Sequence, residues 1–597
     1  MRGKTLKKLK LDDSSYDSIY EKAMQRLEKQ APWWSYKGIS DPGITLVEMW
    51  SLLSDLQSFY LDQVQESHYR KYLKLLGIAP DEGRFAWTWV SFEKVRRNTV
   101  LPEGTKLQAA DMIFETEEEV KLTANSMVSF YLKENETPKD GKDRLNMMNR
   151  LRKTSFPLTA GIQWLFLFKL KKPLKKGEKL DLFVLLDETK QRNSAGPDYC
   201  MAKLTWEYWT QGQYREANVV RDETCGLLYS GRVSLCFESA MEKGETDEGY
   251  PIRCRIEEGT FDVFPVLYRI SLNVVKVFQK NTLCKEEYIN ISPDAPFVTL
   301  KSYLAQTGRI EVYRRCGEDQ WEECTQKCDI DTPVDQFRQK RYLRFKDDFQ
   351  NEMIQRDDNT LKIVCSVQGV RESYAPCAIT GVSSQQITLP WENIRRDSVE
   401  LMLRQGDGAL GFCRYYREDP EEDRVSNAWH WQDENNVIEF GDGRHGDIPM
   451  AAKDGLRLTG LVLWEGDKGN VSIGKITKFE KPELFPDITC SNLVSGTQGR
   501  GRKKPSELFA SLKEIMTVEN RMITAADVKE IAKETPGLII KDVDVLWKDG
   551  KILVTIIPVQ NLDNKYCVPK YINEVKKHLE QYRLVTSRIE VAIGKGN

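Results

Sequence analysis

The chain is poor in histidine and lacks the sequence motifs of the common enzyme classes. Its four histidines include no H-E-x-x-H pair or comparable metal-binding spacing. No G-x-S-x-G motif, no kinase glycine-rich loop and no D-F-G triplet is present. We therefore predict no enzymatic activity, no cofactor and no bound metal. We expect surface or structural roles for His68, His430, His445 and His578, with His578 solvated in a lysine-rich helix.

An excess of charge of one sign is also absent. The 597 residues include 88 lysines and arginines against 90 aspartates and glutamates, which gives a formal net charge of −2. Proteins that bind phosphate backbones need clustered positive charge. We therefore expect no nucleic-acid binding, and we interpret the basic stretches Arg2–Lys10 and Gly499–Pro505 as solvated tails or loops.

Long apolar runs are missing as well. No run approaches the ~20 residues that a membrane-spanning helix needs, and Met1–Asp17 lacks the apolar core of a secretory signal. The 13 cysteines, an odd number, show no spacing typical of a secreted disulfide framework. We expect a soluble protein that is made in the reducing cytoplasm and does not insert directly into a membrane.

The densest cysteine group, Cys316, Cys324 and Cys328, does not form a typical metal site. Its spacing is not C-x₂-C, and no histidine lies close in the sequence. Unpaired thiols in a β region are the favoured interpretation.

A glycine-rich loop at Glu439–Pro449 contains an Asp-Gly pair that is typical of a tight turn. Asp442 and Asp447 are possible Ca²⁺ ligands, but they lack the spacing of an EF-hand. We favour a tight turn whose Arg444 and His445 face a neighbouring subunit.

The pattern of apolar residues along the chain predicts a multidomain α+β protein. The first eighty residues read as helices, and "FAWTWVSFEKV" then alternates as strands do. From about residue 160 to 480, strand-like runs alternate with short turns, and helices return after about 495. We predict an N-terminal helical bundle segment at 1–82, a small β-rich domain at 83–160, β-rich central modules at 161–495 and a small α+β sandwich at 496–597.

A wide apolar helix near the N-terminus is the most distinctive element. Asp41 is a suitable N-cap, Pro42 suits the first helical position, and Gly77 is a typical C-terminal stop. The apolar residues recur at spacings of three and four, which places them on one face. We predict that this face packs against another chain through Leu46, Met49, Trp50, Leu53, Leu56 and Tyr60.

Six blocks of the sequence, in order, resemble the baseplate J-like family of baseplate assembly proteins. They cover nearly the whole chain, although the segment at about 285–380 has no counterpart. The blocks are "DPGITLVEMWSLLSDLQSFYLDQVQESHYRKYLKLLGI", "LPEGTKLQAADMIFETEEEVKL", "LTWEYWTQGQYREANVVRDETCGLLYSGRVSLCF", "NVIEFGDGRHGDIPM", "GDKGNVSIGKITKF" and "NRMITAADVKEIAKETPG".

This resemblance implies a structural wedge subunit of a contractile injection system. Wedges of that kind surround a central spike hub, join it to the contractile sheath and help to transmit the trigger for contraction. The implied partners are a second wedge protein, further copies of the chain itself, the spike hub and a sheath-proximal baseplate protein. The implied location is cytoplasmic assembly into a phage tail-like particle that is released or docked on a membrane.

A different class of function is a tail-associated protein that binds or cleaves carbohydrate. The stretch "WEYWTQGQY" carries Trp206, Tyr208 and Trp209, which are able to stack on sugars. A glycan binder needs such rings exposed in a groove with polar groups nearby. Their position, in a groove or in a subunit contact, separates the two hypotheses.

The C-terminal segment contains a strand, "KILVTIIPV", that is apolar on both faces. Ile552, Val554 and Ile556 alternate with Leu553, Thr555 and Ile557. We predict a compact module that folds by itself and docks its second face, or a strand edge, on a neighbouring baseplate subunit. We expect "GRGRKKP" to be the flexible hinge that enters this module.

Overall fold

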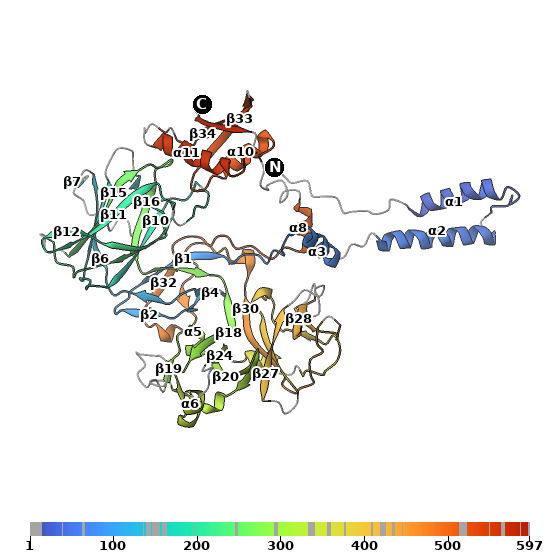
Figure 1. The fold of residues 1–597 in the computed structure, drawn as a ribbon, viewed down its shortest axis with the longest axis horizontal. Helices are drawn as coiled ribbons and strands as arrows, with labels where there is room; N and C mark the ends of the chain where they lie inside the picture. The colour runs from blue at the N-terminus through green and yellow to red at the C-terminus, as the bar shows by residue number, and fades with distance from the viewer. Residues whose placement is uncertain are drawn as a thin grey trace.

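The computed structural model describes most of the chain. The described residues are 15–38, 40–61, 66–134, 137–138, 145, 156–157, 164–190, 192–196, 199–244, 249–291, 297–331, 341–354, 360–374, 378–406, 410–417, 426–432, 436–444, 446–512, 522–548, 550–560, 562, 567–584 and 587–594. Within them the protein is a strand-rich, multidomain α+β structure, as predicted, with several separate sheets (Figure 1).

The N-terminal helices form a hairpin that extends away from the β-rich body (Figure 1). Helices α1 (Tyr16–Gln30) and α2 (Pro42–Leu61) pack side by side in this hairpin. Helix α3 (Glu66–Leu75) lies at the root of the hairpin, where it packs on α8 (Pro505–Ala510). The predicted helix from Asp41 to Gly77 contains α2 and α3, which have different neighbours, and residues 62–65 between them lie outside the described residues.

A six-stranded antiparallel sheet forms the centre of the body. Its order is β31 (Lys478–Phe479), β3 (Lys106–Ala109), β4 (Met112–Thr116), β17 (Val274–Phe278), β1 (Trp87–Glu93) and β32 (Thr489–Asn492). A separate two-stranded sheet is formed by β2 (Thr99–Leu101) and β5 (Val120–Leu122), which precede and follow β3 and β4 in the sequence. Because β1 pairs with both β17 and β32, the predicted boundary at residue 160 cuts across this sheet.

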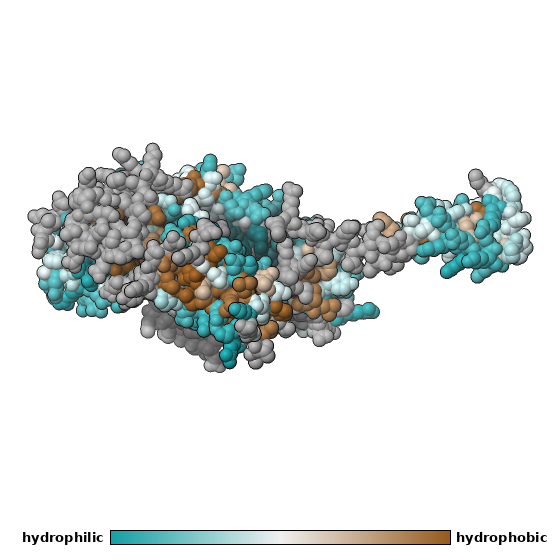
Figure 2. Space-filling model, turned by 90° about the horizontal axis from the view of Figure 1, so that it is seen from above, coloured by the Kyte–Doolittle hydropathy of each residue, from teal (hydrophilic) through white to brown (hydrophobic). Residues whose placement is uncertain are grey.

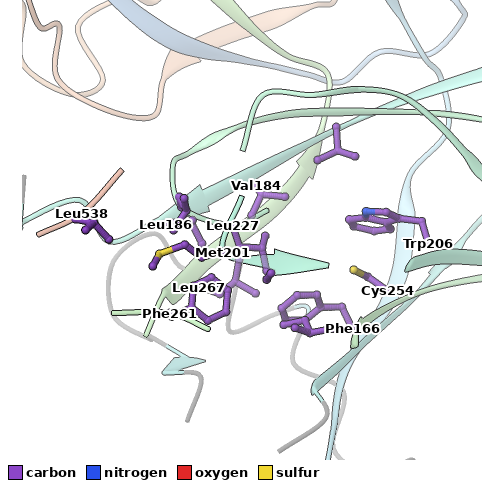
Figure 3. Packing of buried hydrophobic residues seen from close by; sticks show 14 of the residues in the cluster. Phe166, Val184, Leu186, Met201, Trp206, Leu227, Cys254, Phe261, Leu267 and Leu538 are labelled. Atoms are coloured by element: carbon purple, nitrogen blue, oxygen red, sulfur yellow. The ribbon is translucent and has the colours of Figure 1, made fainter. Parts of the chain in front are cut away.

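A β-sandwich occupies one side of the body (Figure 1). Its five-stranded sheet has the order β13 (Asn218–Asp222), β14 (Gly231–Cys236), β10 (Lys179–Leu186), β16 (Val266–Leu272) and β8 (Phe156–Pro157). Its six-stranded sheet has the order β12 (Gln213–Glu216), β11 (Ala202–Thr210), β15 (Tyr250–Gly259), β9 (Trp164–Leu170), β6 (Met127–Glu134) and β7 (Thr137–Pro138). Inward-facing side chains of the two sheets share one apolar core, in which Trp206, Phe166 and Val184 lie together (Figure 3).

A ten-stranded sheet lies on the other side of the body. Its order is β21 (Gln320–Glu323), β20 (Arg309–Gly317), β24 (Thr360–Ser366), β18 (Asn281–Asn290), β30 (Leu456–Leu463), β26 (Glu400–Arg404), β27 (Gly411–Arg417), β28 (Ala428–Trp431), β29 (Val437–Phe440) and β25 (Gln386–Thr388). An additional pairing of β21 with β27 closes seven of these strands into a barrel. The unmatched segment at 285–380 therefore supplies barrel strands.

Smaller elements surround this barrel. They are the three-stranded sheet β19 (Phe297–Thr299), β23 (Tyr342–Phe345) and β22 (Cys328–Asp331), the helices α5 (Tyr303–Thr307), α6 (Asp347–Ile354) and α7 (Val370–Tyr374), and the 3₁₀ turns η1 (Thr325–Lys327), η2 (Arg396–Ser398), η3 (Gly466–Gly469) and η4 (Pro482–Leu484).

The C-terminal unit has the predicted order helix, strand, strand, helix, strand. Its elements are α10 (Ala525–Lys533), β33 (Ile540–Lys548), β34 (Lys551–Pro558), α11 (Cys567–Glu580) and β35 (Arg588–Ile593). Thr524 caps α10 through a bond from the Asp527 amide, as the sequence indicates. Ile552, Val554 and Ile556 are buried, which confirms that the predicted inner face of the strand is covered.

This unit is joined to the β-sandwich by a buried polar contact and by a continuous apolar core. The guanidinium of Arg192 donates to Asp262 Oδ1 at 2.6 Å and to the Gly537 carbonyl at 2.7 Å. Leu538 belongs to the same apolar cluster as Phe261 of the sandwich (Figure 3). The core of the C-terminal unit is therefore continuous with that of the sandwich, and folding of this unit by itself stays a prediction.

The stretch "GRGRKKP" also differs from the predicted flexible hinge. Arg84 and Arg500 exchange two backbone hydrogen bonds, at 2.9 and 3.0 Å, and the Arg500 side chain pairs with Asp81 at 2.6 Å. The Lys503 amide donates to the Asp81 carbonyl at 3.2 Å. These bonds fix the stretch against the segment that connects α3 to β1.

Candidate subunit interface

The turn of the hairpin is built around Asp41. One oxygen of its carboxylate, Oδ1, accepts from the Gly43 amide at 2.7 Å and so caps α2, as predicted. The other, Oδ2, accepts from the indole Nε1 of Trp34 at 2.6 Å. Asp41 therefore holds the incoming loop and the first turn of the helix together.

The side of α2 that packs on α1 is made of serine and β-branched aliphatic side chains. Ile44 and Ser51 are 4% and 1% exposed, while Val47, Ser54 and Ser58 are half-buried. The Ser51 hydroxyl donates to the Val47 carbonyl at 2.8 Å, so its polar group is satisfied within the helix. The half-buried apolar residues of α1 include Ile19, Ala23, Met24 and Leu27.

The opposite side of α2 carries the large apolar side chains, and it is exposed. The six predicted residues are Leu46 (53% exposed), Met49 (49%), Trp50 (66%), Leu53 (46%), Leu56 (43%) and Tyr60 (71%). At about 100° per residue they fall within an arc of about 120° on the helix. We call this arc, together with the flanking residues defined next, the α2 apolar face.

Two further residues widen the α2 apolar face beyond what the spacing argument predicted. Leu52 is 51% exposed and Phe59 is 59% exposed. With them the apolar arc reaches about 180° at the same rotation per residue. The signal in the sequence is that α2 is apolar around most of its circumference, with Glu48 and Asp55 as its only charged residues.

Figure 2 views the molecule from the side on which α1 lies over α2, and this side of the hairpin is largely hydrophilic. The hairpin therefore has a polar face, formed by α1, and an apolar face, formed by α2. No helix within the described ranges is long and apolar enough to cross a membrane.

The root of the hairpin is fixed to the body by α8. Leu73, Leu508 and Leu512 form a buried cluster, and the Tyr69 and Phe509 rings lie 5.2 Å apart. Helix α3 ends at Gly77, which has a φ of 71° as a C-terminal glycine requires. Part of this root is also apolar and exposed, namely Tyr72, Leu75 and Leu76.

Arg444 lies in the loop that follows β29 of the ten-stranded sheet. The loop is the predicted tight turn, since the Gly443 amide donates to the Gly446 carbonyl at 2.9 Å and the Arg444 amide to Asp442 Oδ1 at 2.7 Å. The Arg444 side chain is exposed, and His445 lies outside the described residues.

The aromatic stretch of the carbohydrate hypothesis lies within the sandwich. Trp206 and Tyr208 are each 1% exposed and belong to its core. Trp209 points to the other face of β11, where its ring centre lies 4.9 Å from that of Tyr214. The chain itself covers Trp206 and Tyr208. These two rings therefore line neither a sugar groove nor a subunit contact.

The three cysteines at 316–328 do not come together as a metal site. Cys316 is exposed, whereas Cys324 and Cys328 are buried, and burial raises the pKa of each buried thiol to about 12. Across the described part of the chain, no three His, Cys, Asp or Glu side chains are grouped so that they could hold a metal ion.

A cavity of about 460 Å³ lies where β18 passes between the central sheet and the barrel. Its charged lining is Glu103, Lys106, Glu115, Lys280, Lys285, Glu286, Glu400 and Arg414. Each acid has a basic partner in the chain: Glu103 has Lys285, Glu115 has Lys106, Glu400 has Arg414 and Glu286 has Lys362. The acids of this cavity therefore serve internal ion pairs.

Comparison with known proteins finds a weak structural likeness. No family model matches the chain, and no curated protein matches it. Among solved structures, a chain of the TssK-TssF-TssG baseplate subcomplex of the type VI secretion system is similar to it, with a TM-score of 0.39 and 9% sequence identity. The alignment covers 92% of this chain and 96% of that chain. A likeness of this size is too weak to assign a function.

Proposed function

We propose that this protein is a structural baseplate wedge subunit of a contractile injection system. In this role it links the central spike hub to the sheath and helps to transmit the trigger for contraction. The observation that carries the proposal is the projecting hairpin with its exposed α2 apolar face. The ordered resemblance of six sequence blocks to baseplate J-like proteins supports it independently.

The α2 apolar face favours a permanent assembly. Burying a large apolar side chain contributes about 1.5–3 kcal/mol. The eight side chains of the face are already partly covered, so a partner that buries the rest gains on the order of 10 kcal/mol before the cost of association. Left uncovered, a continuous apolar face of this kind marks an interaction site on a soluble protein.

The width of the face favours two partner helices. A single packed helix covers a stripe of roughly 100°, whereas the α2 apolar face spans about 180° at 3.6 residues per turn. We therefore propose that α2 forms a helical bundle with α1 and with one helix from each of two other wedge chains. A second wedge protein and a further copy of this chain are the proposed sources of those helices.

The outer face of the C-terminal sheet is a proposed second contact. Leu546, on this face, is 67% exposed and lies opposite Leu553 in the register. Ile557 is on the same face, opposite Asp542. A brown patch in Figure 2 lies where the C-terminal unit stands in Figure 1. We propose that a sheath-proximal baseplate subunit covers this face, and that the whole assembly forms in the cytoplasm.

The carbohydrate hypothesis is less well supported. It requires exposed aromatic rings, and Trp206 and Tyr208 are buried in the sandwich core. The proposed role is accordingly a structural one, without catalysis or cofactor.

The double substitution Trp50→Asp and Leu53→Asp tests the proposal. Both side chains are exposed, so the free chain should keep its fold and its thermal midpoint, whereas charged groups within a helical bundle should prevent wedge formation. A matched control, Gln25→Asp with Gln30→Asp, adds two carboxylates to the exposed side of α1 and changes the net charge by the same amount. Particles purified from cells should lack the first variant and contain the control. Normal incorporation of the first variant would refute the proposed role.

A further inference from the structure

The turn between α1 and α2 carries two large aromatic side chains that the described part of the chain leaves open to solvent. Trp33 is 81% exposed and Tyr36 is 63% exposed. Figure 1 shows that this turn lies at the end of the hairpin farthest from the β-rich body. The Trp33 ring makes no hydrogen bond and no ring contact with any residue that the structure describes. We call Trp33 and Tyr36 the aromatic tip.

Hydrogen bonds within the turn hold the aromatic tip in a defined shape. The Trp34 amide donates to the Ala31 carbonyl at 3.0 Å, and the Trp34 indole donates to Asp41 Oδ2 at 2.6 Å. The hydroxyl groups of Tyr36 and Ser40 lie 3.0 Å apart, within hydrogen-bond distance. A turn that is already ordered loses little conformational entropy when a partner encloses it, so the aromatic tip is preorganised for binding.

A partner of the α2 apolar face is within reach of the aromatic tip. Helix α2 begins at Pro42, directly after the turn, and Leu46 lies about 6 Å further along its axis at 1.5 Å per residue. Asp41 bonds to the turn and to the first turn of α2, which keeps the aromatic tip beside the start of the helix. A chain that covers the exposed Leu46 therefore ends, or continues, next to the aromatic tip.

We propose that the aromatic tip is an anchor that inserts into an apolar pocket of a different wedge protein, the one that covers the α2 apolar face. This inference rests on the proposed function and extends the contact to the end of the hairpin. Tryptophan and tyrosine are enriched among the residues that dominate binding free energy, and they fill pockets of the partner. An acceptor in the pocket would pair with the Trp33 indole N–H. The cavity of this chain beside β18 has a charged lining that does not suit an indole, which favours a different protein over a second copy.

A lipid surface fits the hairpin less well. Helices that lie on membranes carry an excess of lysine and arginine on their polar side, and anionic lipids attract basic segments. Helix α1 carries three acidic and three basic residues, and α2 adds only the acidic Glu48 and Asp55. The charges of the two helices therefore favour a protein pocket over a membrane.

The test compares incorporation into particles in cells that make the natural chain and a tagged variant together, with mass spectrometry giving the ratio of the two chains. Trp33→Ala should be under-represented by about tenfold or more, because truncation of an aromatic anchor weakens binding by at least that factor. Trp33→Phe keeps an apolar ring and should lose less. Gln30→Ala, at an exposed position at the end of α1, is the control and should be incorporated like the natural chain. A benzophenone amino acid at residue 36 should give an adduct with a different polypeptide.

Failure of this inference and failure of the proposed function give different results. If the Trp50→Asp and Leu53→Asp variant is excluded while Trp33→Ala enters particles normally, the proposed role stands and the aromatic tip is not an anchor. If both variants enter normally, both proposals fail. An adduct at residue 36 with a second copy of this chain would contradict the assignment to a different wedge protein. Binding of the purified chain to vesicles of phosphatidylcholine and phosphatidylglycerol that Trp33→Ala abolishes would make the tip a lipid anchor. A thermal midpoint lowered by several degrees in Trp33→Ala would make the ring a structural element of the hairpin.

Discussion

A Cβ atom on Gly43 would stand 2.1 Å from the indole ring of Trp34, so the ring occupies the space that any larger residue would need. The same ring is fixed by its hydrogen bond to Asp41. Trp34, Asp41 and Gly43 therefore form one unit that sets the angle between the hairpin loop and α2. This unit determines how the α2 apolar face is presented.

Gly43→Ala should destabilise the start of α2, by roughly 1–2 kcal/mol, although alanine is favoured over glycine in a helix by about 1 kcal/mol. The reason is that the indole must move and give up its bond to Asp41. Hydrogen exchange at the amides of residues 43–47 measures the change. Thr45→Ala, on the exposed side of the same turn, is the control. Slower exchange in Gly43→Ala would show that the ring does not constrain this position.

Arg192→Met should weaken the attachment of the C-terminal unit to the sandwich by about 3–5 kcal/mol, because it leaves a buried carboxylate without its partner. Asp262 is 2% exposed and also accepts from the Ile539 amide at 2.8 Å. Urea denaturation of the full chain measures the loss. The surface pair of Lys551 and Glu590 provides the control, since Lys551→Met should cost less than about 1 kcal/mol. Equal effects of the two substitutions would contradict a joined core.

Trp206→Ala should destabilise the sandwich by about 3–5 kcal/mol, because a fully buried ring leaves a cavity. Trp33→Ala, at a position that is 81% exposed, should change stability by less than about 0.5 kcal/mol. Chemical denaturation compares the two tryptophans directly. On a glycan array the natural chain should show no binding; binding that Trp206→Ala abolishes while the fold survives would favour the carbohydrate hypothesis.

Acidification should destabilise the C-terminal unit through His578, which is half-buried on α11 with its ring 5.2 Å from that of Tyr582. The sequence analysis predicted a solvated His578, whereas the structure half-buries it. Burial lowers its pKa from the ordinary value of 6.5, so the unfolded chain binds the proton first as the pH falls. The contribution of His578 to stability is therefore present above pH 6.5 and lost below it.

Thermal midpoints measured from pH 8 to 5 should fall less steeply in His578→Gln than in the natural chain. A slope that is the same in His578→Gln would show that burial of this imidazole does not affect folding.

The features that the sequence predicted well are local ones. The spacing of Leu46, Trp50 and Leu53 places them on one helix face whatever the rest of the chain does. Asp41, Thr524 and Gly77 act at the helix ends because capping depends on a few neighbouring residues. Alternation also separated the buried Ile552 from Leu553 on the outer face of β34.

The features that the sequence did not predict arise from contacts between distant residues. Strand β1 pairs with β32, about 400 residues later in the chain, so that Val90 lies opposite Asn492. No local sequence pattern predicts such a partner. Arg500 is part of a basic stretch in the sequence, yet Asp81 and Arg84 fix it in the fold. For Trp206 the period-two pattern of β11 was the available signal, because the residue shares a buried face with Tyr208.

The central claim, that another chain covers the α2 apolar face, is tested most directly by site-specific photo-crosslinking in cells. A benzophenone amino acid placed at residue 53 should give a covalent adduct between this chain and a different polypeptide or a second copy, whereas the same group at residue 25 on the exposed side of α1 should not. Mass spectrometry of the adduct identifies the partner and the contacted helix. Contact with a helix of another baseplate protein or of a second copy of this chain is the predicted result. A chain that remains uncrosslinked at residue 53 in assembled particles would contradict the account.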